Sequence, residues 1–470
     1  MRRFALPLML LFLVACTAET SSPAVADHLE AVLGGAQTGA PGRRLDSLVI
    51  VRLVDDRGGP VANAEVHWSL ASGDGTVTPV TATTGSDGTI ATAWTLGLDH
   101  EAQVLQVSAG GVPTLAVTAT ATAFRAISVA QGDGFGCGID LAGDAWCWGS
   151  IYNYPASANF GPTPVRVDSG HALVEVVAGG RHACARSATT TYCWGVGYAV
   201  GQGPGVPTNV YASSGSVVGS HQFTALSADG SGYSTCGLDG AGQGWCWGTD
   251  VDGSLGSLAG WGTTATTPIA IDQGGATFTE LALGYDHGCA LEADGAARCW
   301  GRDRDGKLGD TLNTNSVVLQ ARPVTTDLRF IHIRTGDDTS CGTTASGATW
   351  CWGANSFGAP FNLGPHPWEV TGNGFAPPSI QWQRWASIRS GRVYFWGQFD
   401  VNDYQLPGFY HPTPGELQGG VTAVVQVAMS GQTLCARRVD GVVLCWGYVP
   451  GVEGANGLPA TDTPVAIPAP

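Results

Sequence analysis

Apolar and polar residues alternate along short stretches of this chain, with a period of two instead of the 3.6 of a helix. Residues 48–54 (Leu-Val-Ile-Val-Arg-Leu-Val) and 64–70 (Ala-Glu-Val-His-Trp-Ser-Leu) are two such stretches, and a turn-forming sequence at 55–61 separates them. We find no convincing run of apolar residues at i, i+3, i+4 and i+7. Gly is abundant, at 69 of 470 residues, which suits many tight turns. The pattern predicts an all-β protein.

Twelve of the 13 cysteines form six pairs that recur along the chain. Five pairs are ten residues apart, one is nine apart, and every second cysteine precedes Trp-Gly. A seventh Trp-Gly, at Trp396, follows Phe395, and Trp385 stands ten residues before Phe395. We therefore interpret Trp385 and Phe395 as aromatic replacements for a cysteine pair whose members touch. The pairs are Cys137 and Cys147, Cys184 and Cys193, Cys236 and Cys246, Cys289 and Cys299, Cys341 and Cys351, and Cys435 and Cys445.

The spacing of these pairs predicts disulfides across β-hairpins. In residues 289–299 a three-residue loop ending at Gly295 places Cys289 opposite Cys299, close enough for a disulfide. Each bond would close a loop of about eleven residues and contribute roughly 2–3 kcal/mol. The alternative is zinc, but zinc ligands usually come as Cys-x2–4-Cys knuckles with a second pair nearby, which this spacing does not provide.

Successive Trp-Gly motifs lie 44–53 residues apart, so each of seven repeats has room for four short strands. We predict a seven-bladed β-propeller over residues 124–470. The runs Trp-Gly-x-x-x-x-Gly-x-Leu-Gly at 247–256 and 300–309, with His182 and His287 before their cysteines, resemble the repeats of the regulator of chromosome condensation family. The Thr-Pro-Val-Ala-Ile sequence at 463–467 has no later repeat to join. We expect it to complete the blade that begins at Phe124.

Residues 28–122 contain no cysteine and show strand patterns typical of a β-sandwich. The order Asp-x-x-Gly-x-Pro-Val-x-x-Ala-x-Val-x-Trp at 55–68 resembles the bacterial immunoglobulin-like domains of the invasin and intimin type. That resemblance implies a rigid stalk. We expect Trp68 in the core of this domain and His67 on its surface.

The N-terminus reads Met-Arg-Arg, followed by an apolar run at 4–14 and Leu-Val-Ala-Cys at 13–16, which is typical of a secretory signal. The tetrad resembles a bacterial lipobox, which implies that Cys16 carries lipid; the alternative is a plain signal peptide with an incidental cysteine. We predict a signal peptide at 1–15 and a tether at 16–27. The protein is then exported and anchored to the outer membrane or cell surface, touching the membrane only through lipid.

The net charge is −16, which disfavours nucleic acid as a partner because such a surface repels phosphate backbones. No metalloprotease, nucleophile-elbow or phosphate-loop motif is present, so we predict no enzyme activity, no cofactor and no metal. Residues 303–306 look faintly like a calcium loop but lack the ligand at position twelve. For His182 and His287 we expect structural hydrogen bonding within the blade instead of catalysis.

What remains is binding, and we predict a protein partner at the cell envelope. The loops after each Trp-Gly are long and uneven and should gather on one face of the ring. Aromatic residues are favoured anchors at protein interfaces. The alternatives are that these aromatics only pin their loops, that the protein is a structural envelope component, or that it is an enzyme acting on envelope polymers. The candidate binding residues are Tyr152, Tyr154, Tyr198, Trp261, Phe361, Trp368, Tyr404, Phe409 and Tyr410.

Overall fold

The chain forms two compact units in a computed structural model. The first comprises residues up to 37 with 44–95 and 102–119, and the second comprises 38–43, 96–101 and 120–470. No helix among the described residues is long and apolar enough to cross a membrane. The structure describes residues 25–39, 41–97, 102–129, 135–151, 158–208, 210–228, 232–259, 261–312, 315–354, 364–381, 384–398, 410–417, 420–430, 433–447 and 461–469.

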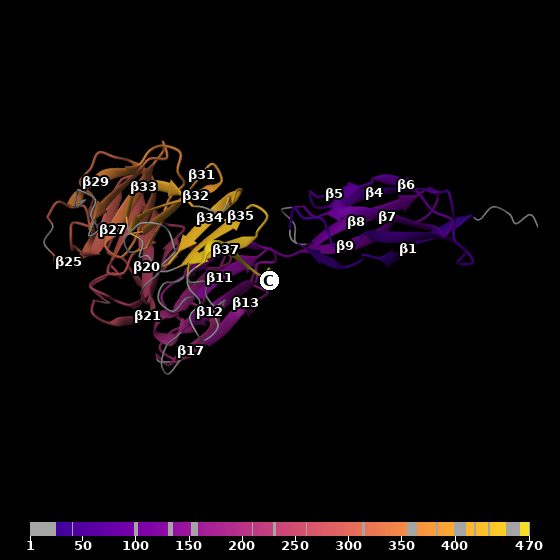
Figure 1. The fold of residues 1–470 in the computed structure, drawn as a ribbon. Coiled ribbons are helices and arrows are strands. Elements are labelled where there is room, and N and C mark those ends of the chain that lie inside the picture. Colours follow the sequence, from indigo (N-terminus) through magenta and orange to yellow (C-terminus); the bar gives the residue numbers. More distant parts are fainter. Residues whose placement is uncertain are drawn as a thin grey trace, which may run out of the picture. The chain divides into compact units, whose positions relative to one another are not determined.

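Strands β1 to β9 form two sheets near the N-terminus (Figure 1). Burial alternates along β4, where Val66 and Trp68 are buried and His67 between them is exposed, as predicted. One sheet has the order β1 (Ala26–Leu33), β3 (Val49–Asp55), β7 (Thr89–Thr95), β5 (Thr76–Thr78). The other has the order β2 (Gln37–Gly39), β9 (Leu115–Ala121), β8 (Ala102–Ala109), β4 (Glu65–Ser72), β6 (Thr81–Thr83).

Seven four-stranded antiparallel sheets follow in the second unit, each built from consecutive strands (Figure 1). We call them blades 1 to 7. Blades 1 to 3 comprise β10 (Phe124–Val129), β11 (Phe135–Asp140), β12 (Ala145–Ile151), β13 (Ala158–Asp168); β14 (Glu175–Ala178), β15 (His182–Arg186), β16 (Thr191–Val196), β17 (Tyr211–Ser216); and β18 (Phe223–Ala228), β19 (Ser234–Asp239), β20 (Gly244–Thr249), β21 (Thr264–Ala270).

Blades 4 and 5 comprise β22 (Phe278–Leu283), β23 (His287–Glu292), β24 (Ala297–Arg302), β25 (Val317–Pro323); and β26 (Phe330–Thr335), β27 (Thr339–Thr344), β28 (Thr349–Gly353), β29 (Gly364–Thr371). Blades 6 and 7 comprise β30 (Ser379–Gln381), β31 (Arg384–Arg389), β32 (Arg392–Gln398), β33 (Tyr410–Glu416); and β34 (Val424–Met429), β35 (Thr433–Arg438), β36 (Val443–Gly447), β37 (Thr461–Ile467). A single 3-10 turn, η1 (Gly197–Ala199), lies among the described residues of blade 2.

All six predicted disulfides are present, with Cα–Cα distances of 4.0–4.1 Å between directly opposed residues of the second and third strands. Each disulfide shares a buried cluster with the Trp-Gly tryptophan of the next blade. At the junction of blades 1 and 2, Trp194 Nε1 donates to Cys147 Sγ at 3.3 Å. The same pairing occurs between blades 7 and 1, where Trp148 packs with Cys435 and Cys445. The ring is therefore closed by the contact that joins its other blades.

The predicted closure by a shared blade is wrong. Strand β37 pairs with β36 in blade 7, and blade 1 has its own fourth strand, β13, which contains Thr163-Pro164-Val165. Each Thr-Pro-Val strand is the outermost strand of the blade before it, so no strand is left over at either end. At the seam, Gln426 of β34 adds two hydrogen bonds to the packing of Trp148: its Nε2 donates to Ile127 O at 2.8 Å and its Oε1 accepts from Ile127 N at 3.2 Å.

The predicted contact in the sixth repeat is also wrong in register. Phe395 lies opposite Ala386, and Trp385 lies opposite Trp396 with the two rings stacked 6.4 Å apart. The reason is the turn, because Ser390 and Gly391 form a two-residue connection with φ of 51° and 72°. The opposed positions are therefore nine residues apart, as they are for Cys184 and Cys193 in blade 2. In blade 6, Ala386 and Phe395 therefore occupy the two positions that form the disulfide in the other blades.

Candidate functional site

Strand direction alternates within each blade, so the connections fall on two ends of the ring. The connections between strands 1 and 2 and between strands 3 and 4 lie at one end, which we call the loop face. The hairpin turns between strands 2 and 3, with the connections between blades, lie at the other end, which we call the turn face.

Two of the predicted binding residues lie in described connections of the loop face. Trp261, between β20 and β21 of blade 3, is 57% exposed. Tyr198, in η1 of blade 2, is partly buried and packs edge-on against Tyr233 with the rings 5.4 Å apart. The guanidinium of Arg181 stacks over the Tyr233 ring at 5.4 Å. Tyr198 thus pins its loop, whereas Trp261 projects from the surface.

The other predicted residues do not share this location. Trp368 is 54% exposed but lies within β29, opposite Cys351, on the outermost strand of blade 5. Tyr410 is the first residue of β33, at the outer strand of blade 6. The remaining predicted residues fall outside the described part of the chain; these are Tyr152, Tyr154, Phe361, Tyr404, Phe409 and the lipidation candidate Cys16.

Three further apolar side chains on the loop face were missed by the sequence analysis. Leu258, in the same connection as Trp261, is 77% exposed, and Leu312, in the corresponding connection of blade 4, is 58% exposed. Tyr285, between strands 1 and 2 of blade 4, is 39% exposed. Together with Trp261 these residues form what we call the apolar patch. The prediction considered only aromatic residues after Trp-Gly, so it overlooked both leucines and the shorter connection that carries Tyr285.

Carboxylates hold the two long connections that carry the apolar patch. In blade 3 the Asp250 carboxylate accepts hydrogen bonds from Leu255 N at 3.0 Å and from Gly262 N at 2.8 Å. In blade 4 the Asp310 carboxylate accepts from Leu312 N at 3.1 Å. These contacts fix the backbone on both sides of Trp261 and at Leu312. Hydrogen bonds therefore hold the described backbone next to these exposed side chains, which lowers the entropy cost of binding through them.

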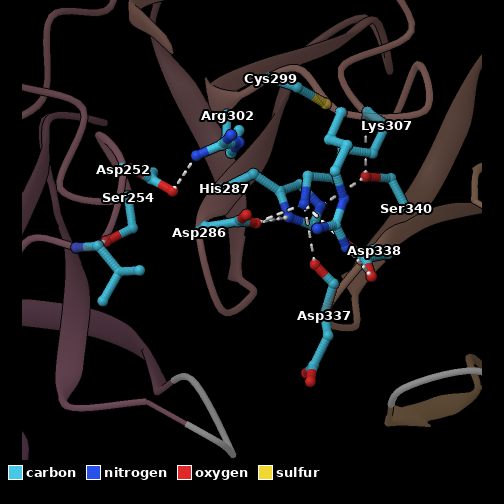
Figure 2. Close-up of polar contacts among 12 residues, drawn as sticks. Asp252, Ser254, Asp286, His287, Cys299, Arg302, Lys307, Asp337, Asp338 and Ser340 are labelled. Carbon is cyan, nitrogen blue, oxygen red and sulfur yellow. Dashed lines mark hydrogen bonds and ion pairs between the residues drawn. The ribbon is translucent and has the colours of Figure 1, made fainter. Parts of the chain in front are cut away.

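The sole lysine, Lys307, lies at the centre of a buried ionic cluster under the loop face, at the junction of blades 4 and 5 (Figure 2). Its Nζ donates to Asp286 Oδ1 at 2.5 Å, to Asp338 Oδ1 at 2.9 Å and to Asp337 O at 3.2 Å. Arg304 donates to the other oxygen of Asp338 at 2.7 Å. Lys307 is fully buried, and these contacts offset part of the cost of burying its ammonium group.

The cluster sets the protonation of its members. Burial acts to raise the pKa of Asp286, but the neighbouring His287 ring and the charge of Lys307 outweigh burial and hold that pKa below its usual range. Burial lowers the pKa of His287. Asp286 is therefore a carboxylate and His287 a neutral ring at neutral pH. The arrangement pairs the buried charge of Lys307 with the carboxylates of Asp286 and Asp338.

His182 and His287 bond to the next blade instead of within their own. His287 Nε2 lies 2.9 Å from Ser340 Oγ, and His182 Nε2 lies 2.6 Å from Thr235 Oγ1. Ser340 in turn donates to Lys307 O at 2.9 Å. Burial lowers the pKa of His182 to about 4. His182 and His287 occupy the same position in their repeats, and each joins its blade to the next one.

A cavity of about 410 Å³ runs along the axis of the ring and is lined by the innermost strands of all seven blades. Several of its polar side chains are engaged in joining blades. The hydroxyls of Ser128, Ser227 and Ser379 accept hydrogen bonds from the backbone of the next blade at 2.9, 2.9 and 3.0 Å. Arg334 pairs with Glu280 at 2.5 Å. No group of three or more metal-ligating side chains occurs in the described residues.

Comparison with known proteins agrees with this geometry. The family model for the Regulator of chromosome condensation (RCC1) repeat matches residues 278–307, in blade 4. The Saccharomyces cerevisiae protein Prp20p has a similar fold, with a TM-score of 0.57 and 19% identity over 74% of this chain and 87% of that one. The second unit is a β-propeller of the RCC1-repeat type. Human WBSCR16 is similar to this RCC1-type propeller, with a TM-score of 0.56 and 16% identity over 66% of this chain and 85% of that one.

Two curated relatives match by sequence. The mitochondrial RCC1 domain-containing protein RUG3 of Arabidopsis thaliana is 27% identical over 209 residues, which are 40% of this chain and 44% of RUG3. The ultraviolet-B receptor UVR8 of the same plant is 25% identical over 235 residues, which are 46% of this chain and 50% of UVR8. The matched part of this chain thus spans half or less of these relatives. The similarity therefore concerns the RCC1-type propeller.

Proposed function

We propose that this protein is a lipid-anchored protein of the cell envelope or surface whose RCC1-type propeller binds a protein partner through its loop face. The observation that carries the proposal is the apolar patch, with Trp261, Leu258 and Leu312 all more than half exposed on adjacent blades. Apolar residues exposed on the same face of adjacent blades favour association, since burying them in an interface removes them from water. Trp261 and Tyr285 are of the types that most often dominate binding energy.

The remaining parts of the proposal concern the export of the protein and its attachment to the membrane. The Leu-Val-Ala-Cys tetrad at 13–16 supports export and lipid attachment at Cys16. The two sheets of the first unit, with alternating burial in β4, support an immunoglobulin-like domain that acts as a spacer. Substituting Cys16→Ser should release the protein from the membrane fraction and remove the mass of the acyl chains. A Cys16→Ser protein that stayed in the membrane fraction would contradict the anchor.

The binding face can be tested by affinity capture from detergent-solubilised envelope. The double variant Trp261→Ala and Leu312→Ala should lose at least nine-tenths of a specifically captured protein, because truncating a tryptophan that dominates an interface costs about 2 kcal/mol or more. Trp368→Ala is the matched control, since Trp368 is equally exposed but lies on the outer wall of blade 5. Equal capture by the double variant would refute the proposal that the partner binds the loop face. No specific capture by any form would favour the alternative, a structural envelope component.

A further inference from the structure

A second pocket, of about 250 Å³, lies on the turn face at the seam between blades 7 and 1. Two arginines line it, Arg125 at the start of β10 and Arg437 near the end of β35. Leu141 and Val439, from the hairpin turns of blades 1 and 7, also line it, together with Pro41, Ala123, Phe124 and Gly441. The pocket is therefore separate from the apolar patch, which lies at the opposite end of the ring.

Neither arginine is paired with a carboxylate among the described residues. Arg125 donates through Nη2 to Leu173 O, and its Nε is buried without a hydrogen-bond partner. Arg437 donates through Nε to Gln426 Oε1 at 3.1 Å. Burial alone lowers the pKa of Arg437, with no acidic group acting against it.

Several other arginines of the propeller do have a carboxylate partner. Arg186, Arg298 and Arg392 each contact a glutamate within 2.5–2.6 Å. The chain has 38 acidic residues for 22 basic ones, so carboxylates are plentiful. Arg125 and Arg437 are partly buried without a carboxylate partner, and their hydrogen bonds to the neutral Leu173 O and Gln426 Oε1 do not neutralise their charge. A bound anion would offset it, because the guanidinium fork matches two oxygens of a carboxylate or phosphate.

We propose that this seam pocket binds a small oxyanion, a carboxylate or phosphate group, between Arg125 and Arg437. A volume of about 250 Å³ is below that of pockets for drug-sized ligands, which favours a small anion. Such an anion bridges the first and last blades beside the Gln426 contacts that close the ring. Binding therefore stabilises the closed propeller.

The test is a titration of the full chain with inorganic phosphate, sulfate or succinate, followed by thermal unfolding and calorimetry. Chloride at matched ionic strength is the control, because it screens the acidic surface without offering two oxygens. We expect a saturable rise in melting temperature with at least one oxyanion and none with chloride. Phosphate alone identifies a phosphate site, and succinate alone a carboxylate site. No saturable rise with any of the three overturns the proposal.

Variants separate ligand binding from folding. Arg437→Gln should weaken oxyanion binding at least tenfold, whereas Arg57→Gln, at a fully exposed arginine of the first unit, should leave it unchanged. Because Arg437 also contacts Gln426, a second variant leaves both arginines intact. Val439→Glu places a carboxylate at the rim, since Val439 is 48% exposed. It should raise the melting temperature without phosphate and abolish the phosphate-dependent rise. An unaltered response in Val439→Glu and Arg437→Gln overturns the proposal.

Discussion

Replacing Lys307 with methionine should destabilise the RCC1-type propeller far more than the loss of any single exposed charge. Methionine fills a similar volume, so the change removes mainly the charge and its three hydrogen bonds. Asp286, whose side chain is only 8% exposed, then keeps a negative charge without a cationic partner. Removing one member of a buried pair typically costs about 3–5 kcal/mol. Asp338 retains Arg304, so we place the loss of unfolding free energy at about 3–4 kcal/mol.

Urea unfolding followed by tryptophan fluorescence measures this loss, because the Trp-Gly tryptophans are buried at the blade junctions. Arg302→Met is the control; it breaks the partly exposed pair between Arg302 of blade 4 and Asp252 of blade 3 and should cost at most about 1 kcal/mol. Asp286→Asn in the Lys307→Met background should restore more than half of the loss, since it removes the stranded charge. A Lys307→Met cost no larger than the Arg302→Met cost would refute the reasoning.

Three further predictions concern the seam, the acid range and the C-terminal strand. Gln426→Ala should lower the unfolding free energy by about 2–4 kcal/mol, because it leaves both backbone groups of Ile127 unpaired; an unchanged urea midpoint would contradict this. The folded pKa of His182 lies near 4 and its unfolded value near 6.5, so its stabilisation is complete above pH 6.5 and declines by about 3 kcal/mol toward pH 4. His182→Gln should therefore flatten the pH dependence of the melting temperature between pH 7 and 5, and an equally steep profile would argue against His182. Deleting residues 461–470 removes β37 from blade 7 and should lower the melting temperature by many degrees; an unchanged melting curve would show that β36 does not need this partner.

The blade hairpins could be predicted from sequence because cysteine spacing reports which residues face each other. Cys289 and Cys299 are opposed as predicted, and Gly295 has the positive φ, +83°, that its loop requires. The sixth blade lacked that marker, and counting ten residues back from Phe395 gave Trp385 instead of Ala386. Turn length sets register, and a one-residue difference in the turn shifts every later pair. The dipeptide Ser390-Gly391 is the sequence feature that indicates the shorter, two-residue turn.

Ring closure could not be decided in the same way, because the repeat sequence is periodic and a period has no intrinsic starting point. A Thr-Pro-Val strand between two Trp-Gly motifs can belong to the blade before it or to the blade after it. The hydrogen-bond register shows the former, since Cys445 lies opposite Val465 and Cys147 opposite Val165. Closure then depends on side-chain contacts such as that of Gln426, which no spacing rule encodes.

The proposed binding residues and the buried lysine are departures from the repeat, and they can be recognised only when equivalent positions are compared. Ser254 and Lys307 occupy the same place in the run Trp-Gly-x-x-x-x-Gly-x-Leu-Gly, yet only Lys307 carries a charge into the blade junction. Tyr233 packs against Tyr198, whereas Tyr285, one residue earlier in its own repeat, is more than a third exposed. A position that must join blades tolerates few residue types, because its contacts recur at every junction. A position whose residue type varies between repeats is not held to that role, so comparing repeats within one chain separates candidates for binding from residues that join blades.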